Sequence, residues 1–329
     1  MKKMKKSLLL LLLVATTFSF GQSANLDRAY FKVRYTRLPA TPILDASKRT
    51  YSTNNSQLYV AGFSQTDDAT LTIHYQFDET NAQFIKIDKR EDIKKDKEGK
   101  VISRKMYYSA ISQYTSSGSF SVKNAITGKT HRHPFFYKDE DKSSEFDTYS
   151  KAVEDYRRNK YDLKNQYEKK HRDAMIRESN DYLNTNYGYP INKFKGVFWI
   201  LGKKKHPEYA KHRANYEKAK EIFSKMKADE PIDDIKKELQ PVIDYFIATA
   251  KKYVGKKKRM RKMRYASYYN LAAIYYYLDN PAKTKEYAEK LIANDYDKKD
   301  GKHFIRIADK LQARFNVNKT TSRHFKVNP

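Results

Sequence analysis

The sequence predicts an α+β protein with a strand-rich N-terminal part and an all-helical C-terminal part. Three observations lead to this class. From Gln22 to about Lys138, apolar residues tend to alternate with polar ones, which is the period of half-buried strands. From Glu145 the apolar spacing changes to three and four, the period of a helix, and no Pro or Gly interrupts it before Gly188. Shorter helical patterns then follow as far as residue 315.

Residues 22–141 are expected to form an N-terminal antiparallel β-sandwich-like domain. The clearest strand pattern is the strict alternation of Leu71, Ile73, Tyr75 and Phe77 with polar residues. Ser117-Gly118 and Thr127-Gly128 are typical turn signals. Further strands are expected at 29–35, 58–63, 83–87, 101–108, 118–123 and 134–137. Six or seven short strands favour a sandwich or a partly closed barrel.

Residues 142–188 are predicted to be a long connecting helix between two domains. Uninterrupted, this helix would be roughly 60 Å long at 1.5 Å per residue. Its apolar seam is broken by Lys160 and Lys170, so we expect it to lie partly along its own chain rather than to form a coiled-coil dimer.

Residues 189–329 are expected to form an all-α domain, the second unit with its own core. It begins with the most apolar stretch after residue 21, at 196–202, which we interpret as a core segment; an exposed membrane-dipping or partner-docking loop is the alternative. Helices are expected at 206–228, 232–254 and about 302–315, with a helical hairpin at 265–297. The chain from residue 316 to the end is expected to be frayed.

The hairpin at 265–297 carries the most specific pattern in the chain. Asp279-Asn280-Pro281 fits between its two helices, because Asn or Asp caps a helix and Pro fits its first turn. It resembles a tetratricopeptide repeat, whose first helix has an aromatic residue, Leu, a small residue and Tyr at these spacings. The repeat-like residues are Tyr268, Leu271, Ala272, Tyr275, Ala288 and Leu291.

The resemblance covers about one repeat, and its second helix departs from the family pattern. Thr284 stands where the family prefers Ala, Ala288 where it prefers an aromatic residue, and Tyr296 where it prefers Pro. The resemblance implies a scaffold that binds other proteins and does not catalyse a reaction. An ordinary helical hairpin, with Tyr and Leu in its core, is the alternative.

Residues 1–21 have the layout of a secretory signal peptide. Four lysines precede an apolar run from Leu8 to about Phe20, and small residues at Ser19 and Gly21 precede an expected cut ahead of Gln22. The sequence has no cysteine, so neither a lipid anchor on an N-terminal Cys nor a disulfide is expected. The expected location is the bacterial periplasm, with peripheral attachment to the outer membrane as a variant.

The formal net charge of +28 at pH 7 favours an anionic partner. After export, nucleic acid is not expected, and the candidates are an envelope protein with an acidic face, an anionic lipid or a glycan. The densest positive cluster lies within 251–264, and we name it the basic corner. Its expected partner-binding residues are Lys256, Lys257, Lys258, Arg259, Arg261, Lys262 and Arg264. A solvated loop between helices is the alternative interpretation.

Motifs of catalysis are not found. The sequence contains no GxSxG, HExxH or GxGxxG motif, and the lack of cysteine excludes thiol nucleophiles and thiolate metal sites. His131 and His133 would share one face of a strand, but such a pair is more often an ordinary part of the surface than a metal site. No cofactor, metal or enzymatic activity is expected.

The sequence therefore favours an exported, periplasmic or envelope-associated adaptor. It would bind a protein partner through its tetratricopeptide-like helical domain, as a subunit of a larger outer-membrane-associated complex. The alternative is a glycan- or peptidoglycan-binding protein that uses the N-terminal β domain.

Overall fold

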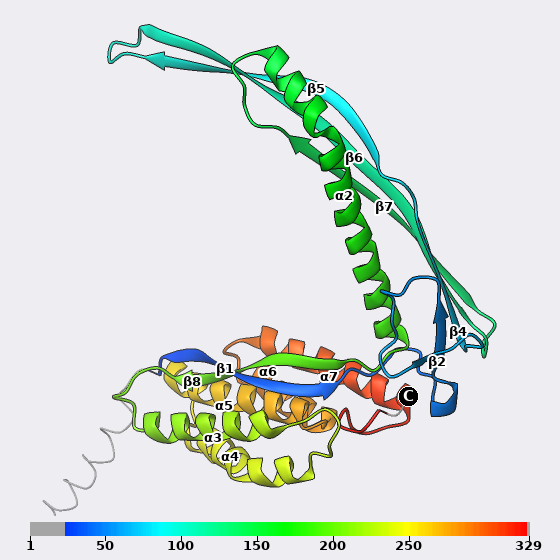
Figure 1. Ribbon diagram of the computed structural model, residues 1–329. Coiled ribbons are helices and arrows are strands. Elements are labelled where there is room, and N and C mark those ends of the chain that lie inside the picture. Colours follow the sequence, from blue (N-terminus) through cyan, green and yellow to red (C-terminus); the bar gives the residue numbers. More distant parts are fainter. Residues whose placement is uncertain (1–23, 328–329) are drawn as a thin grey trace, which may run out of the picture. The chain divides into compact units, whose positions relative to one another are not determined.

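The computed structural model describes residues 24–327, so the signal peptide expected over residues 1–21 lies outside the described residues. The chain divides into two compact units. The first unit combines the described residues up to Leu44 with those from Gly188 onward, and the second unit is Asp45–Tyr187. The α+β class is confirmed: both helices and strands are well represented (Figure 1). Over residues 24–327, no helix is both long and apolar enough to cross a membrane.

The second unit is built on one sheet, not on two packed sheets. Long β6 at its centre pairs with β4 and β5 along one edge and with β7 along the other, and β2 and β3 extend the sheet beyond β4. A short 3-10 turn at Ala46–Lys48 precedes it. The strands are β2 (Thr50–Thr53), β3 (Ser64–Gln65), β4 (Leu71–Phe77), β5 (Asn81–Lys95), β6 (Val101–Asn124) and β7 (Thr130–Lys142). The expected sandwich is therefore replaced by a single sheet.

Helix α2 (Tyr149–Asn186) supplies the layer that covers this sheet. Thr148 caps its first turn by accepting the Lys151 N–H. Tyr167 stacks on Tyr114 of β6 with 4.3 Å between ring centroids, and Met175 and Leu183 are fully buried. The long helix was predicted correctly, but its role as a connector was not, because it belongs to the core of the second unit.

Gly118 lies inside the continuous strand β6, so the turn expected at Ser117-Gly118 is wrong. A Cβ atom there would lie 2.6 Å from the Gln76 carbonyl oxygen and 2.8 Å from the Met175 sulfur. Glycine is therefore needed for the close approach of α2 to the sheet, not for a reversal of the chain.

The segment 58–63, expected as a strand, is a loop that α2 holds in place. Leu58 and Val60 are buried, which gives the alternating pattern of a strand. Its backbone, however, bonds to side chains: Asn180 accepts the Tyr59 N–H, and Asn184 accepts the Ala61 N–H and donates to the Tyr59 carbonyl. Two amides thus take the place of a neighbouring strand.

The first unit combines a two-stranded ribbon with five helices. Strand β1 (Leu26–Thr36) pairs antiparallel along its full length with β8 (Ile191–Leu201). The domain boundaries expected at 22–141 and 189–329 are therefore wrong, because the first strand belongs with the helices. The helices are α3 (Tyr209–Lys225), α4 (Asp233–Lys252), α5 (Lys258–Tyr277), α6 (Pro281–Ala293) and α7 (Lys298–Asn318).

Aromatic side chains join the ribbon to the helices. Phe31 of β1 lies 4.8 Å from Phe223 of α3, centroid to centroid, and its ring edge meets Phe198 at 4.6 Å and Tyr277 at 5.7 Å. On the far edge of β8, the Asn270 amide donates to the Trp199 carbonyl and accepts the Trp199 N–H. The apolar stretch 196–202 thus belongs to the core, as expected, but most of it is strand β8, so the expectation of an all-α domain over 189–329 is wrong.

The helical hairpin expected around 279–281 is present as α5 and α6. Asn280 caps α6 by accepting the Lys283 N–H, and Pro281 occupies the first turn. Tyr275 stacks on Tyr287 with 5.5 Å between centroids. Of the repeat-like residues, four are buried and two, Tyr268 and Tyr275, are half-buried: the buried ones are Leu271, Ala272, Ala288 and Leu291. The residues of this pattern thus pack in the core of the hairpin. That the hairpin belongs to the repeat family stays a prediction.

The C-terminal segment, expected to be frayed, is anchored through residue 325. The buried Asp279 carboxylate accepts from the Arg323 side chain and backbone N–H, each at 2.6 Å, and from His324 Nδ1 at 2.9 Å. Burial favours the neutral acid, but the Arg323 guanidinium and His324 outweigh it and hold the pKa of Asp279 at about 2. The Thr36 N–H donates to the Arg323 carbonyl, so this segment also lies against β1.

A candidate binding groove in the second unit

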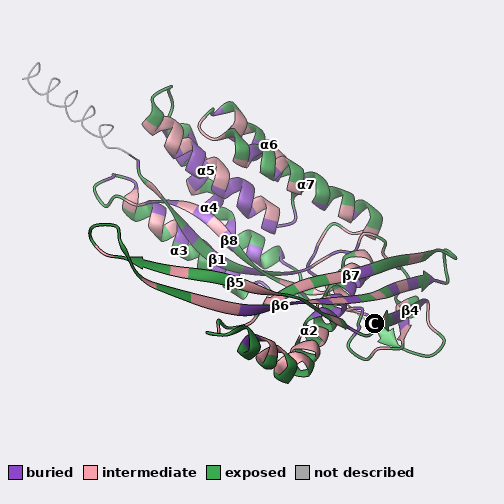
Figure 2. Cartoon of the chain, turned by 90° about the horizontal axis from the view of Figure 1, so that it is seen from above, coloured by how far each residue is buried: buried purple, intermediate pink, exposed green. Residues whose placement is uncertain are grey.

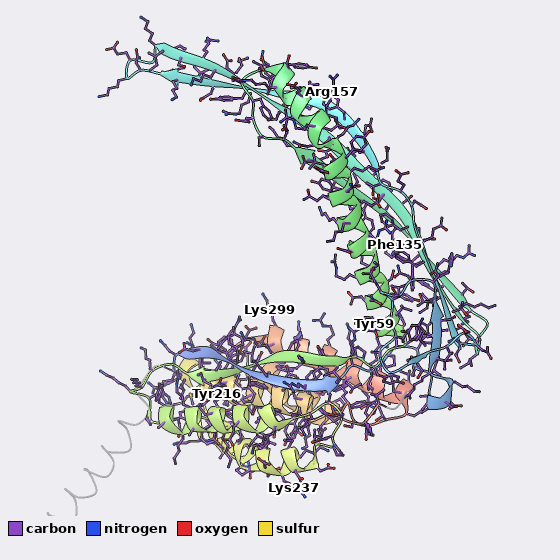
Figure 3. All side chains as sticks on the ribbon, viewed as in Figure 1. Tyr59, Phe135, Arg157, Tyr216, Lys237 and Lys299 are labelled. Carbon is purple, nitrogen blue, oxygen red and sulfur yellow. The ribbon has the colours of Figure 1, made fainter. Side chains whose placement is uncertain are left out.

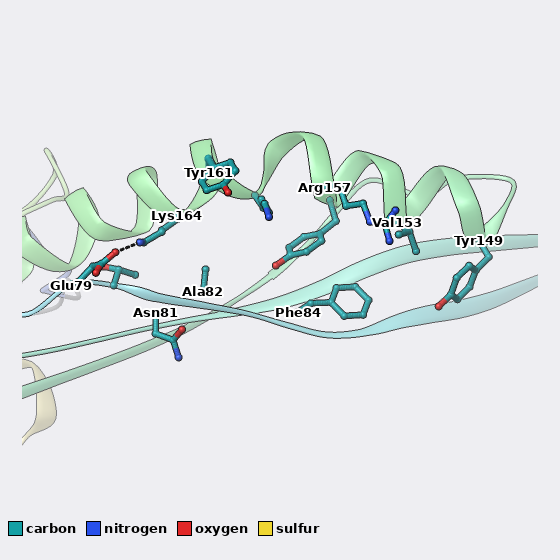
Figure 4. A pocket seen from close by; sticks show the side chains of 12 residues that line it. Glu79, Asn81, Ala82, Phe84, Tyr149, Val153, Arg157, Tyr161 and Lys164 are labelled. Atoms are coloured by element: carbon teal, nitrogen blue, oxygen red, sulfur yellow. Dashed lines mark hydrogen bonds and ion pairs between the residues drawn. The ribbon is translucent and has the colours of Figure 1, made fainter.

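The candidate site in the second unit is a groove of about 740 Å3 between the first half of α2 and the start of β5 (Figure 4). The strand side contributes Glu79, Thr80, Asn81, Ala82 and Phe84, and the helix side contributes Tyr149, Val153, Tyr156, Arg157, Lys160, Tyr161 and Lys164. Its volume is in the range of ligand-binding sites.

The groove exists because α2 packs tightly on the sheet only in its second half. There Met175, Leu183 and the ring of His171 are buried. Figure 2 colours the chain by the burial of each described residue. In the first half, fewer side chains are buried, and Phe84 meets Tyr156 at 5.1 Å between centroids. Strand β5 is also the last strand on its edge of the sheet and has an irregular register between Phe84 and Lys86.

Aromatic rings and positive charges line the groove together. Tyr161 is 67% exposed and lies under the Lys160 ammonium, 4.7 Å from the ring centroid. Lys164 forms an ion pair with Glu79, the only acidic residue of the lining. In contrast, neither Arg157 (Figure 3) nor Lys160 pairs with a carboxylate among residues 24–327. The groove therefore presents uncompensated positive charge beside aromatic surface, which suits an anionic ligand with flat or apolar groups.

A buried chain of hydroxyl, imidazole and carboxylate groups lies next to the groove. The oxygen of Thr80 is 2.7 Å from that of Ser116, which is 2.7 Å from His171 Nδ1, and His171 Nε2 donates to Asp139 at 2.9 Å. Lys170 and His171 lower the pKa of Asp139. This is the residue set of a serine hydrolase.

These hydrogen-bonded side chains nevertheless have a structural role. Ser116 is 2% exposed, and the Thr80 hydroxyl occupies its other side, so a substrate carbonyl could not reach the serine oxygen. The chain instead satisfies the polar groups buried where α2 meets β6, as buried hydroxyl and imidazole groups require.

The basic corner is divided between structural and exposed residues. Arg264 donates to the carbonyls of Tyr253 and Gly255 and to the Asn294 side chain, and so joins the C-terminal ends of α4 and α6. Arg261 donates to the Asp295 carbonyl at 2.7 Å. Arg259 and Lys262 are half-buried, and Lys256, Lys257 and Lys258 are exposed. Of the seven expected partner-binding residues, these three lysines are therefore the fully exposed ones.

The two histidines considered for a metal have aromatic contacts. His131 stacks on Tyr182 of α2 with 4.3 Å between centroids, and the His133 ring meets Phe135 at 4.6 Å. Within the described part of the chain, no group of three or more histidine or acidic side chains is placed to hold a metal ion.

Sequence reasoning missed the groove. Tyr149, Val153 and Tyr156 follow the apolar spacing of the long helix, and nothing local indicates that β5 lies opposite them. A signal was present in Lys160, which interrupts that seam with positive charge. We found no match to this chain among protein-family models, curated proteins or solved structures.

Proposed function

We propose that the protein is an exported, non-enzymatic adaptor of the cell envelope that holds an extended acidic segment of a protein partner. The observation that carries this proposal is the position of the basic, aromatic groove along an edge strand of the sheet. An edge strand offers backbone groups that can pair with an added strand, and neighbouring side chains select what is added.

The charges favour an acidic segment. Arg157 and Lys160 stand without a carboxylate partner among the described residues, and the one acidic residue of the groove is already paired with Lys164. Aromatic rings beside these cations add apolar contact area to the same surface. Export is proposed from the pattern of residues 1–21, and a contribution of the tetratricopeptide-like hairpin to partner binding is proposed from its resemblance alone.

A glycan is the second candidate for the groove. Exposed aromatic rings such as Tyr161 and Tyr149 together with the Asn81 amide are groups that can stack on sugar rings and hydrogen-bond to hydroxyls. This candidate makes no use of the edge-strand backbone, so we rank it below the protein partner.

A photoreactive residue at Tyr161 tests the proposal in cells of the native host. We expect a covalent adduct with a protein in the envelope fraction, and its loss in the double variant Arg157→Gln, Lys160→Gln. The matched control is Arg158→Gln, Lys169→Gln, which removes two exposed charges from α2 outside the groove. An adduct that is removed by glycan-degrading enzymes would favour the second candidate, and equal adducts in both double variants would contradict a role of the groove charges.

A further inference from the structure

We propose that the first unit has a separate binding site, on the β1–β8 ribbon, for a single anionic amphiphile: one alkyl chain that ends in a phosphate group. The site is a hollow of about 690 Å3. It is lined by β1, β8 and α3, through Tyr30, Phe31, Lys32, Val33, Arg34, Lys193, Phe194, Lys195, Lys220 and Ser224. The lining contains five positive side chains and no acidic one.

Four of these positive side chains form an array of two pairs, and the members of each pair lie directly opposite each other on β1 and β8. The register places Lys32 opposite Lys195 and Arg34 opposite Lys193. Like charges directly opposite each other on a β-ribbon destabilise it. Among residues 24–327, no carboxylate forms an ion pair with any of the four; Lys195 lies instead over the Tyr30 ring, 4.0 Å from its centroid. A ligand with more than one negative oxygen would relieve this repulsion, which favours a phosphate.

Apolar side chains line the same hollow. Phe194 pairs with Val33 in the register, so the two share the face of the ribbon that carries Phe31, and Phe194 is 48% exposed there. A hollow whose lining combines a half-exposed phenylalanine with unpaired cations fits neither a free inorganic ion nor a neutral lipid. It fits a molecule that has an anionic end and an apolar chain.

An added peptide strand is a poorer occupant, because the free edge of β1 is already partly used. The Tyr30 carbonyl accepts from the Tyr216 hydroxyl at 2.7 Å, and the Arg34 carbonyl accepts from His324 Nε2 at 3.1 Å. The Thr36 N–H donates to the Arg323 carbonyl at 2.8 Å. Between these bonds only the stretch around Lys32 remains, which is too short for the repeated backbone pairing on which strand addition depends.

Titration of the full chain with dodecyl phosphate, below the concentration at which it forms micelles, tests this site. Trp199, the only tryptophan, lies on β8 and serves as a fluorescence reporter beside calorimetry. We expect saturable binding of one molecule per chain. Dodecyl maltoside, which has the same chain without charge, and inorganic phosphate alone should each bind at least tenfold more weakly.

Two variants separate the array from overall charge. The change Lys32→Gln, Arg34→Gln, Lys193→Gln, Lys195→Gln should weaken binding at least tenfold. The control Lys251→Gln, Lys256→Gln, Lys257→Gln, Lys258→Gln removes the same charge from exposed positions of the same unit and should leave binding unchanged. Phe194→Asn changes an exposed residue and should weaken the binding of dodecyl phosphate without altering thermal stability.

Three outcomes would overturn the proposal. They are wild-type affinity in the array variant, an equal loss in the control variant, and binding of an oligoglutamate peptide as tight as that of dodecyl phosphate. Equally tight binding of oligoglutamate would mean that the array binds an acidic peptide.

Discussion

His212 shows how one buried side chain makes the fold sensitive to acid. It is fully buried on α3, against the rings of Tyr245 and Phe246, and neither ring nitrogen has a hydrogen-bond partner among the described residues. Burial lowers the pKa of His212 to about 4, although the nearby Glu208 carboxylate acts in the opposite direction. The folded protein therefore keeps this ring neutral.

We expect stability to fall as the pH drops from 6.5 towards 4, because in this window the unfolded chain binds a proton that the folded chain excludes. The loss from this group should reach about 3 kcal/mol. His212→Phe removes the titrating group and keeps a ring among rings. Denaturant unfolding at pH 7 and pH 5 should show a smaller loss in the variant than in the wild type, and equal losses would contradict the assignment. Asp279 titrates at lower pH, so it does not contribute here.

At the scale of the element, the contact between α2 and β6 depends on the missing side chain of Gly118. We expect Gly118→Ala to destabilise the protein by about 1–3 kcal/mol, because the Cβ atom would meet a backbone carbonyl that cannot move aside as a side chain can. Ser119→Ala, at the exposed neighbouring position, is the control and should change stability by less than about 0.5 kcal/mol. Thermal unfolding measures both, and an unaltered Gly118→Ala protein would argue against close packing at this point.

Elements whose signals are local were predictable from the sequence. The long helix α2 follows from an uninterrupted helical period, and the α5–α6 junction follows from Asn280 and Pro281. The loop at 58–63 was mistaken for a strand, because Leu58 and Val60 give the burial pattern of a strand while Asn180 and Asn184, far along the chain, supply the hydrogen bonds.

Sites built from distant segments were not predictable. The groove requires β5 to lie beside α2, and the cationic array requires Lys32 to lie opposite Lys195, a register that neither segment encodes locally. In the basic corner, charge density was visible in the sequence, but the use of Arg264 to bond the ends of two helices was not.

At the scale of the whole molecule, the second unit is inserted into the first between Leu44 and Gly188. Close to this boundary the two segments of the first unit are joined, since the Arg37 N–H donates to the Pro190 carbonyl at 2.9 Å. We therefore expect residues 45–187 to fold alone, and residues 22–44 joined to 188–329 by a short Gly-Ser linker to fold as well. Each should unfold cooperatively in a thermal melt monitored by circular dichroism.

A fragment of residues 22–141 is the contrasting case. It contains β1 without β8 and the sheet without α2, so it should lack a cooperative transition and bind a dye that reports exposed apolar surface. A native-like melt of this fragment would contradict the division into units.

The pairing of β1 with β8 also sets an order of events for a chain that is synthesised from its N-terminus. The second unit is continuous, so it can complete its sheet and helix while the remainder of the chain is still arriving. Strand β1 has no partner until residues 191–201 have emerged, and until then it presents an open edge of the kind that invites aggregation or attack by proteases. A product that stops short of β8 carries this exposed strand, so quality control could recognise incomplete chains by their first strand.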